Sequence, residues 1–527
     1  EQLIKDILSG IIVAIIALPL SIALAIASGV GPVQGLYTAI VAGFVISALG
    51  GSSVQIAGPT AAFATIVAGI VAKDGLDGLV ISTILAGIFL ILMGFCHFGS
   101  LIKFIPYTIT TGFTSGIAVT IVIGQLKDFF GITYPDGVKP IETTEKFKAF
   151  AENISTINTD ALIVGIVSLA ILIISPMLLK RIPGSLIAVI VGSLMVQFLP
   201  LKVSTIGNLY MISNSLPSFH LPEVNVQIVQ NAIPNAFTIA VLAAIESLLS
   251  CVVADGMING KHRSDMELVA QGAGNIASAL FGGIPATGAI ARTAANIKNG
   301  GRTPVAGMVH SITLVIVLVV LMPFAGMIPM PTIAAILFVV AYNMCQWRTF
   351  VHMLKTAPKS DIIVLIVTFI LTVVFDLVVA IEIGMVIACL LFIKRMSEET
   401  RVDSWVYVDD DTPEIDDHLA RLPLAIRVYE ITGPLFFGAS DAIEHIVVKD
   451  FTKCLILRMR SVPALDSTAL KDLVDTCEKK GITIVFSHVN EQPMKVMKKA
   501  GFIELVGKEH FCPNIAAALK HAEDCID

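Results

Sequence analysis

The sequence predicts a polytopic α-helical membrane domain followed by a small soluble α/β domain. Apolar residues make up 55% of its 527 residues and charged residues only 14%, whereas soluble proteins usually carry about 25% charge. The charges are also unevenly distributed, because 34 of them lie in residues 405–527 and the other 42 are spread over the first 404. We therefore assign residues 1–400 to a membrane domain and residues 405–527 to a soluble domain.

Charge and cysteine usage argue against several classes of protein. The net charge of −6 comes entirely from the tail, which argues against a nucleic-acid-binding protein. The eight cysteines are scattered and form no Cys-x-x-Cys pair, so we expect neither a disulfide scaffold nor a metal site. The first apolar stretch contains Pro19 and lacks an Ala-x-Ala-like cleavage site, which indicates a membrane span rather than a signal peptide.

Fourteen apolar segments are candidates for crossing the membrane, since a spanning helix needs roughly 20 mostly apolar residues. The eleven clear segments are 8–28, 35–50, 78–96, 108–125, 161–179, 184–199, 234–254, 305–324, 331–345, 361–375 and 377–393. Three further segments are short, rich in small residues and interrupted by Gly or Pro, namely 57–72, 268–282 and 287–298. Seven segments fall in each half of the domain, at about 1–200 and 230–400.

The distribution of Lys and Arg among the loops predicts the topology. Loops on the side of the N-terminus hold twelve Lys and Arg residues, and loops on the other side hold six. Because cytoplasmic loops are enriched in Lys and Arg, we predict that both termini are cytoplasmic. The soluble tail is then cytoplasmic as well.

The two halves of the membrane domain show an internal repeat. A shift of 227 positions places Pro59–Thr65 on Ala286–Arg292, with one Thr and two Ala coinciding, and Ser47–Gly51 also resembles Ser278–Gly283. Because each half contains an odd number of segments, the halves must have opposite orientations. We predict a 7+7 inverted repeat, the alternative being chance similarity among Ala-rich helices.

The repeat indicates a binding site at the two interrupted segments 57–72 and 287–298. Such segments at corresponding positions of inverted repeats indicate the substrate site of a transporter. Two half-helices with facing N-termini present unpaired N–H groups and positive dipole ends, which suit an anion. The small residues that would let the anion approach the backbone are Thr60, Ala61, Ala62, Gly288 and Ala289. The alternative is that these residues only permit close helix packing.

Two ionisable residues lie within the predicted spans near this site. Glu246 is in the middle of a span, with Ser250 one turn further on the same face, and Arg292 lies about one turn inside the second half-helix. A charge at such a depth is costly, so a functional role is the default interpretation. We predict that Arg292 attracts the anion and that Glu246, with Ser250, exchanges a proton. The alternative is a structural ion pair between Glu246 and Arg292.

The tail alternates short apolar runs with helix-like stretches. Residues 424–431, 454–459 and 482–487 are predicted to be strands, and residues 469–480 and 493–500 helices, which favours a small α/β domain. Asp466-Ser467-Thr468 precedes a predicted helix, so one of the three is expected to be its N-cap. A regulatory phosphorylation of Ser467 is the alternative. We find no nucleotide-binding fingerprint, and we expect no cofactor.

Several motifs resemble those of the SulP family of anion transporters. They are Leu18–Ala23, Ala57–Ala62 and Ile290–Asn296 in the membrane domain, and Gly433–Phe437 and Leu465–Thr468 in a tail that is similar to a STAS domain. The resemblance covers nearly the whole chain and implies a fourteen-span fold with core and gate subdomains, an elevator-type motion and a homodimer.

The resemblance also implies roles for individual residues. Thr60 to Ala62 and Gly288 to Arg292, including Ile290, would line the anion site, and Glu246 would be the proton-linked acid. Ala291 stands where many relatives have Ser, so a hydroxyl contact from this position is not expected here. The stretch Ala244–Leu249 is most similar to the bacterial C4-dicarboxylic acid transporter within the family.

The function that follows is proton-coupled uptake of C4-dicarboxylates (succinate, fumarate or aspartate) or of sulfate across the bacterial inner membrane, in contact with lipid. The alternatives are a sodium-coupled bicarbonate transporter, a chloride/bicarbonate exchanger, and an anion channel or sensor. Relatives with Asp at the position of Glu246 are sodium-coupled bicarbonate carriers, so the resemblance favours protons over sodium here. We find no nucleophile–base pair or metal cluster beside the site, so an enzyme is not expected.

Overall fold

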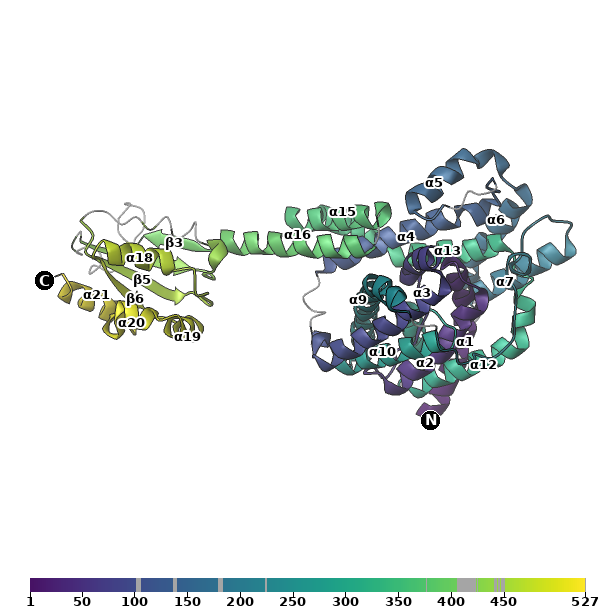
Figure 1. Cartoon of the computed structure of the whole chain (residues 1–527), viewed down its shortest axis with the longest axis horizontal. Coiled ribbons are helices and arrows are strands. Elements are labelled where there is room, and N and C mark those ends of the chain that lie inside the picture. The colour runs from purple at the N-terminus through teal and green to yellow at the C-terminus, as the bar shows by residue number, and fades with distance from the viewer. Residues whose placement is uncertain are drawn as a thin grey trace. The chain divides into compact units, whose positions relative to one another are not determined.

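A computed structural model of the chain describes residues 1–100, 106–135, 140–178, 183–222, 225–375, 377–404, 423, 425–439, 443, 446 and 451–526. The chain divides into two compact units, Glu1–Met385 and Val386–Asp527 (Figure 1). The start of the tail predicted at residue 405 lies outside the described residues.

The membrane unit is built from helices and two very short strands. Its first half contains α1 (Gln2–Ala27), α2 (Pro32–Leu49), β1 (Ala57–Gly58), α3 (Ala61–Phe95), α4 (Tyr107–Phe130), α5 (Thr143–Glu152), α6 (Thr159–Leu178), α7 (Gly184–Phe198) and α8 (Ile206–Leu209). Its second half contains α9 (Val226–Ile258), α10 (Ser264–Leu280), β2 (Thr287–Gly288), α11 (Ile290–Lys298), α12 (Val305–Ala325), α13 (Met330–Cys345), α14 (Trp347–Thr356) and α15 (Lys359–Val374), and α16 (Leu377–Glu398) follows.

The predicted polytopic helical fold is confirmed. Every one of the fourteen predicted segments overlaps a helix, and α3 is interrupted at Gly75, where φ is 72° and ψ is −172°. This break separates the predicted segments 57–72 and 78–96. Among the described residues, eight helices are both long and apolar enough to cross a membrane, so the count of fourteen crossings stays a prediction.

Helices from the two halves pack into two groups (Figure 1). In one group α1, α2 and α3 pack against α9, α10, α11 and α12, and in the other α4 and α6 pack against α13 and α15, with α7 on α6. In the repeat, α1 corresponds to α9, α2 to α10, and the part of α3 after Gly75 to α12. The contact of α1 with α12 is matched by that of α9 with α3, and the contact of α2 with α12 by that of α10 with α3. This exchange of equivalent pairs is what an inverted repeat requires.

The structure corrects the offset of the repeat. Ala61 and Ile290, which begin α3 and α11, are 229 positions apart, and the left-handed residues that follow α1 and α9, Gly29 and Asn259, are 230 apart. The offset of 227 is therefore wrong by two or three positions. An alignment between two Ala-rich segments can shift by a few positions and still match several residues, because Ala occurs at many positions in both.

In its described residues, the tail unit is a five-stranded sheet with helices. Its strands are β3 (Arg401–Ser404), β4 (Ile426–Thr432), β5 (Cys454–Ser461), β6 (Thr483–Ser487) and β7 (Phe511–Cys512), in the order β3-β4-β5-β6-β7. Only β3 is antiparallel to its neighbour. The helices α18 (Lys471–Lys479) and α19 (Glu491–Lys499) were predicted within a few residues, whereas α20 (Phe502–Val506), α21 (Ile515–Asp524) and the short edge strands β3 and β7 were not.

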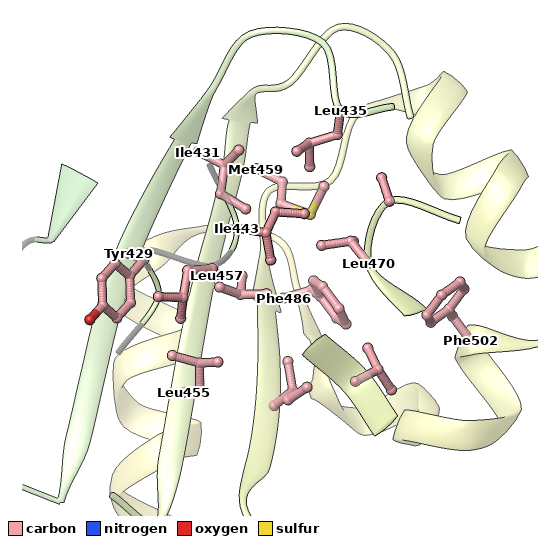
Figure 2. Packing of buried hydrophobic residues seen from close by; sticks show 14 of the residues in the cluster. Tyr429, Ile431, Leu435, Ile443, Leu455, Leu457, Met459, Leu470, Phe486 and Phe502 are labelled. Atoms are coloured by element: carbon pink, nitrogen blue, oxygen red, sulfur yellow. The ribbon is translucent and has the colours of Figure 1, made fainter. Parts of the chain in front are cut away.

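Alternating side chains of the central strands form a core on each face of this sheet. Leu455, Leu457 and Met459 of β5 belong to the larger cluster, together with Phe486 of β6 and Leu470 (Figure 2). The intervening β5 residues Cys454 and Ile456 face Ala518 and Ala522 of α21 on the other side. Coverage of both faces is expected for a mostly parallel sheet, and it holds α21 against β5, β6 and β7.

Candidate anion-binding site

Two helix N-termini meet at a short antiparallel strand pair in the membrane unit. In this pair Ala57 lies opposite Gly288 and Gly58 opposite Thr287. The strands β1 and β2 lead directly into α3 and α11, and the antiparallel pairing makes the two helices leave in opposite directions. Their N-terminal ends therefore face each other across the pair, as the sequence predicted from segments 57–72 and 287–298.

No side chain in the described part of the chain caps either of these helices. Thr60 occupies the N-cap of α3 with φ of −126° and ψ of 159°, yet its hydroxyl makes no cap hydrogen bond. Ala289 occupies the N-cap of α11 and has no side-chain acceptor to offer. Because the first N–H groups of a helix have no partner within the helix, both ends retain donors and a positive dipole for an anion.

Arg292 reaches from α11 to the turn that starts α3. Its side chain is only 4% exposed, and Nη2 donates a hydrogen bond to the carbonyl oxygen of Pro59. The other terminal nitrogen, Nη1, is buried and has no hydrogen-bond partner among the described residues. A buried donor on a charged group is costly to leave unsatisfied, so Nη1 is suited to an anionic partner.

Glu246 reaches the same turn from α9. Thr60 Oγ1 donates a hydrogen bond of 2.9 Å to Glu246 Oε2, which explains why the Thr60 hydroxyl does not cap α3. No ion pair joins Glu246 to Arg292 in the described part of the membrane unit. The two charged groups contact neighbouring residues, Thr60 and Pro59, instead of each other, so a direct ion pair that locks the helices together is not present.

The other predicted site residues separate into accessible and buried sets. Thr60 and Ala289 are partly accessible, and Ile290 is 42% exposed. Ala61, Ala62 and Gly288 are buried. Ser250 is also buried, and its hydroxyl lies 3.5 Å from Thr293 Oγ1 of α11.

Glycine at positions 58 and 288 has a packing reason. A Cβ added to Gly58 would lie 2.5 Å from Arg292 Nη1, and a Cβ added to Gly288 would lie 2.3 Å from Gln55 Nε2. Separations this short do not occur between real atoms of these kinds, so the absent side chains make room for Arg292 and Gln55. These two glycines therefore leave space for the side chains of Arg292 and Gln55 beside the site. The sequence interpretation was instead that Gly288 lets an anion approach its backbone.

A buried carboxylate that the sequence analysis did not identify supports the same strands. Glu267 of α10 is fully buried and accepts hydrogen bonds from the Gly51 amide at 2.9 Å, Gln55 Nε2 at 2.7 Å and Ser247 Oγ at 3.0 Å. It thus fixes the loop that leads into β1. Its position at the start of a helix resembles that of an ordinary terminal acid, so the sequence contains no signal for this role.

His310 is a second residue that the sequence analysis did not single out. It lies in α12, is fully buried, and has no hydrogen-bond partner for either ring nitrogen among the described residues. An ionisable side chain within a 20-residue apolar span is itself a functional signal, and this signal would have found His310.

In the tail, the side chain of Asp466, rather than that of Ser467, accepts hydrogen bonds from backbone amides in the segment before α18. Asp466 Oδ1 accepts hydrogen bonds from the amides of Thr468 at 2.9 Å and Ala469 at 2.8 Å, and Oδ2 accepts one of 2.7 Å from the Phe437 amide. Burial by itself raises the pKa of Asp466, but these hydrogen bonds outweigh it and hold the pKa below its ordinary value. Ser467 is exposed, and its phosphorylation stays a prediction.

Comparisons with known proteins agree with this arrangement. Residues 3–368 match the model of the sulfate permease family, and residues 419–518 match that of the STAS domain. The chain belongs to the sulfate permease family. It is 39% identical over 520 residues to a putative sulfate transporter, YvdB, of Bacillus subtilis, covering 96% of this chain and 95% of that protein. It is 32% identical to the bicarbonate transporter BicA of a Picosynechococcus strain, covering 90% and 86%.

Solved structures of the family share the fold. The transmembrane domain of a cyanobacterial BicA matches with a TM-score of 0.64 and 28% identity, covering 74% of this chain and 97% of that one. SLC26A9 matches with a TM-score of 0.86 and 20% identity, covering 99% and 90%, and at this identity only the fold is comparable. The protein is therefore an anion transporter of the membrane and not an enzyme.

Proposed function

We propose that this member of the sulfate permease family carries a dianion together with one proton. The observation that supports this most directly is the meeting of Arg292 and Glu246 at the Pro59–Thr60 turn, between two uncapped helix N-termini. Arg292 and the helix ends attract the anion, and Glu246 supplies a carboxylate that can take up a proton beside it.

The balance of charge fits two loaded states, a dianion with a proton or a monoanion alone. Arg292 contributes one positive charge, and each helix N-terminus contributes about half a charge, which totals about +2 if His310 is neutral. With Glu246 protonated, this charge matches sulfate or a C4-dicarboxylate such as succinate. With Glu246 ionised, the sum falls to about +1 and matches a monoanion such as bicarbonate. When the anion is a dianion, the loaded site is closest to neutral, and crosses a low-dielectric barrier most easily, if each dianion brings one proton.

The names of the relatives support both of the candidate charge states. YvdB is described as a putative sulfate transporter and BicA as a bicarbonate transporter. Bicarbonate transport coupled to sodium, or exchanged for chloride, is accordingly the second candidate function.

The decisive experiment is uptake by the full-length protein reconstituted into proteoliposomes. We expect labelled sulfate or succinate uptake to be saturable, to increase as the external pH falls, and to acidify the lumen, as reported by an enclosed pH-sensitive dye. Sodium-stimulated bicarbonate uptake with no proton movement would favour the second function. Currents without saturable uptake would favour a channel.

The remaining features of the proposal concern arrangement and motion. We propose that the protein lies in the bacterial plasma membrane as a homodimer with both termini in the cytoplasm. The group of α1, α2, α3 and α9 to α12 contains the whole candidate site, so an elevator motion of this group against α4, α6, α7, α13 and α15 could move the site intact.

A further inference from the structure

We infer that the tail unit contains a binding site for a transition-metal ion such as Zn²⁺, formed by His510, His521 and Cys525. The donor atoms of these three residues all lie within 4.8 Å of one another, and among the described residues no other group of three His, Cys, Asp or Glu side chains meets this condition. The sequence analysis expected no metal site, because it searched for cysteine pairs close together in sequence.

The separations of the donor atoms fit a single ion after small adjustments. His521 Nε2 lies 2.9 Å from His510 Nδ1 and 3.8 Å from Cys525 Sγ. Tetrahedral zinc, with bonds of about 2.0 to 2.3 Å, requires neighbouring nitrogen and sulfur donors to be roughly 3.3 to 3.6 Å apart. The observed distances lie on both sides of this interval. Imidazole nitrogen and thiolate sulfur are the donors that zinc prefers.

Two rigid elements hold the three residues in place. His521 and Cys525 are four residues apart, on one face at the C-terminal end of α21. His510 ends the short helix η5 (Lys508–His510), directly before the edge strand β7. Because Ala518 and Ala522 of α21 are buried against the sheet, the helix cannot rotate its histidine away without losing core contacts.

The surroundings of the cluster resemble those of a metal-binding histidine. Nε2 of His510 lies 3.9 Å from Glu509 Oε1, beyond hydrogen-bonding distance, so a carboxylate lies near the second ring nitrogen, where metal-bound histidines commonly have one. His510 is mostly buried, with 17% of its side chain exposed, whereas Cys525 is exposed. The ion can therefore enter from solvent at Cys525, whose thiol releases its proton to solvent when it binds.

A bound ion would join the end of α21 to the β7 edge of the sheet. Three protein ligands leave a fourth position for water or another donor, as in zinc sites that are not purely structural. An alternative explanation of the cluster is a simple hydrogen bond between the two histidines, which involves neither Cys525 nor a metal. The experiment must therefore detect a bond from the ion to the thiolate.

The test uses Co²⁺ as a coloured probe on the reduced, chelator-treated full-length protein in detergent. We expect one equivalent of Co²⁺ to produce a thiolate-to-cobalt charge-transfer absorption, and Zn²⁺ to abolish it by displacement. Cys525→Ser should remove this absorption, and His521→Ala should weaken Co²⁺ binding at least tenfold.

The matched control is Cys389→Ser, which alters another exposed free cysteine, in α16. Its Co²⁺ spectrum should be the same as that of the unaltered protein. Absence of the charge-transfer absorption in the unaltered protein, or its full retention in Cys525→Ser, would overturn the inference and leave the histidine–histidine hydrogen bond as the explanation. Since Cys525 is exposed and follows the last helical residue, Cys525→Ser should fold, and circular dichroism checks this.

Discussion

Arg292→Lys tests whether one guanidinium both holds the turn before α3 and binds the anion. In the structure Nη2 donates to the Pro59 carbonyl, while the buried Nη1 has no hydrogen-bond partner among the described residues. Lys keeps the positive charge, but its single ammonium lacks the rigid fork that lets a guanidinium bond two acceptors at fixed positions. We expect the Lys variant to fold and to bind anions more weakly than the wild type.

The size of the effect follows from the one hydrogen bond that Lys cannot make. A hydrogen bond to a charged group contributes about 1.5 to 3 kcal/mol, which corresponds to an increase in Kd of roughly 10- to 150-fold. Arg292→Ala, which also removes the charge, should weaken binding further and at every pH. The loss should be similar for sulfate and succinate, because the guanidinium recognises negative charge rather than the rest of the ligand.

Isothermal titration of the purified full-length protein with sulfate and with succinate measures these changes. Arg302→Lys is the matched control, because Arg302 Nη1 also donates to carbonyl oxygens, those of Ile297 and Gly301, but lies outside the site. It should bind anions as the wild type does. If Arg292→Lys binds with unchanged affinity, Nη1 is not an anion donor, and Arg292 serves only to hold the Pro59 turn.

Four further predictions concern the coupling acid, the site and the tail. Wild-type dianion affinity should change tenfold per pH unit where one proton is coupled. Glu246→Gln should abolish this slope in titrations across roughly pH 5 to 8, whereas the control Glu382→Gln, a change at an exposed acid of α16, should keep the slope. An unchanged slope in Glu246→Gln would exclude Glu246 as the coupling acid. Thr60→Trp should abolish binding in a protein that still elutes as a single species, and retained affinity would place the anion elsewhere. Because hydrogen bonds lower the pKa of Asp466, its stabilisation exists above the ordinary Asp pKa of about 3.9 and is lost as the pH falls through the lower folded value. Asp466→Ala should therefore cost about 1 kcal/mol at neutral pH and less in acid, measured by hydrogen exchange of the Thr468 and Ala469 amides that Asp466 binds, and a cost that does not change with pH would contradict this. Deleting the residues after about 400 should leave anion binding measurable, and its loss in a folded, monodisperse truncation would show that the tail contributes to the site.

Composition and hydropathy alone were enough to predict the long apolar helices of the membrane unit and the central strands of the tail, but not the shorter helices α5, α8 and α14. A bilayer requires long apolar helices, and a sheet with two buried faces requires apolar runs such as Cys454–Met459, so both features appear in short windows of sequence. The two interrupted segments were visible for the same reason, because Gly58-Pro59 and Pro285 break helices locally. Glu246 and Arg292 stood out because charges within apolar spans are rare.

The tertiary structure decided which side chains contact each other, and the local sequence does not encode these contacts. Glu246 pairs with Thr60 rather than with Arg292, and Gly288 is small because Gln55 packs against it. The ligand cluster of the tail joins His510 to Cys525, 15 positions further along. Each of these contacts joins segments that are brought together by packing over the whole unit, and hydropathy, which depends on one residue at a time, cannot encode a distance between two of them.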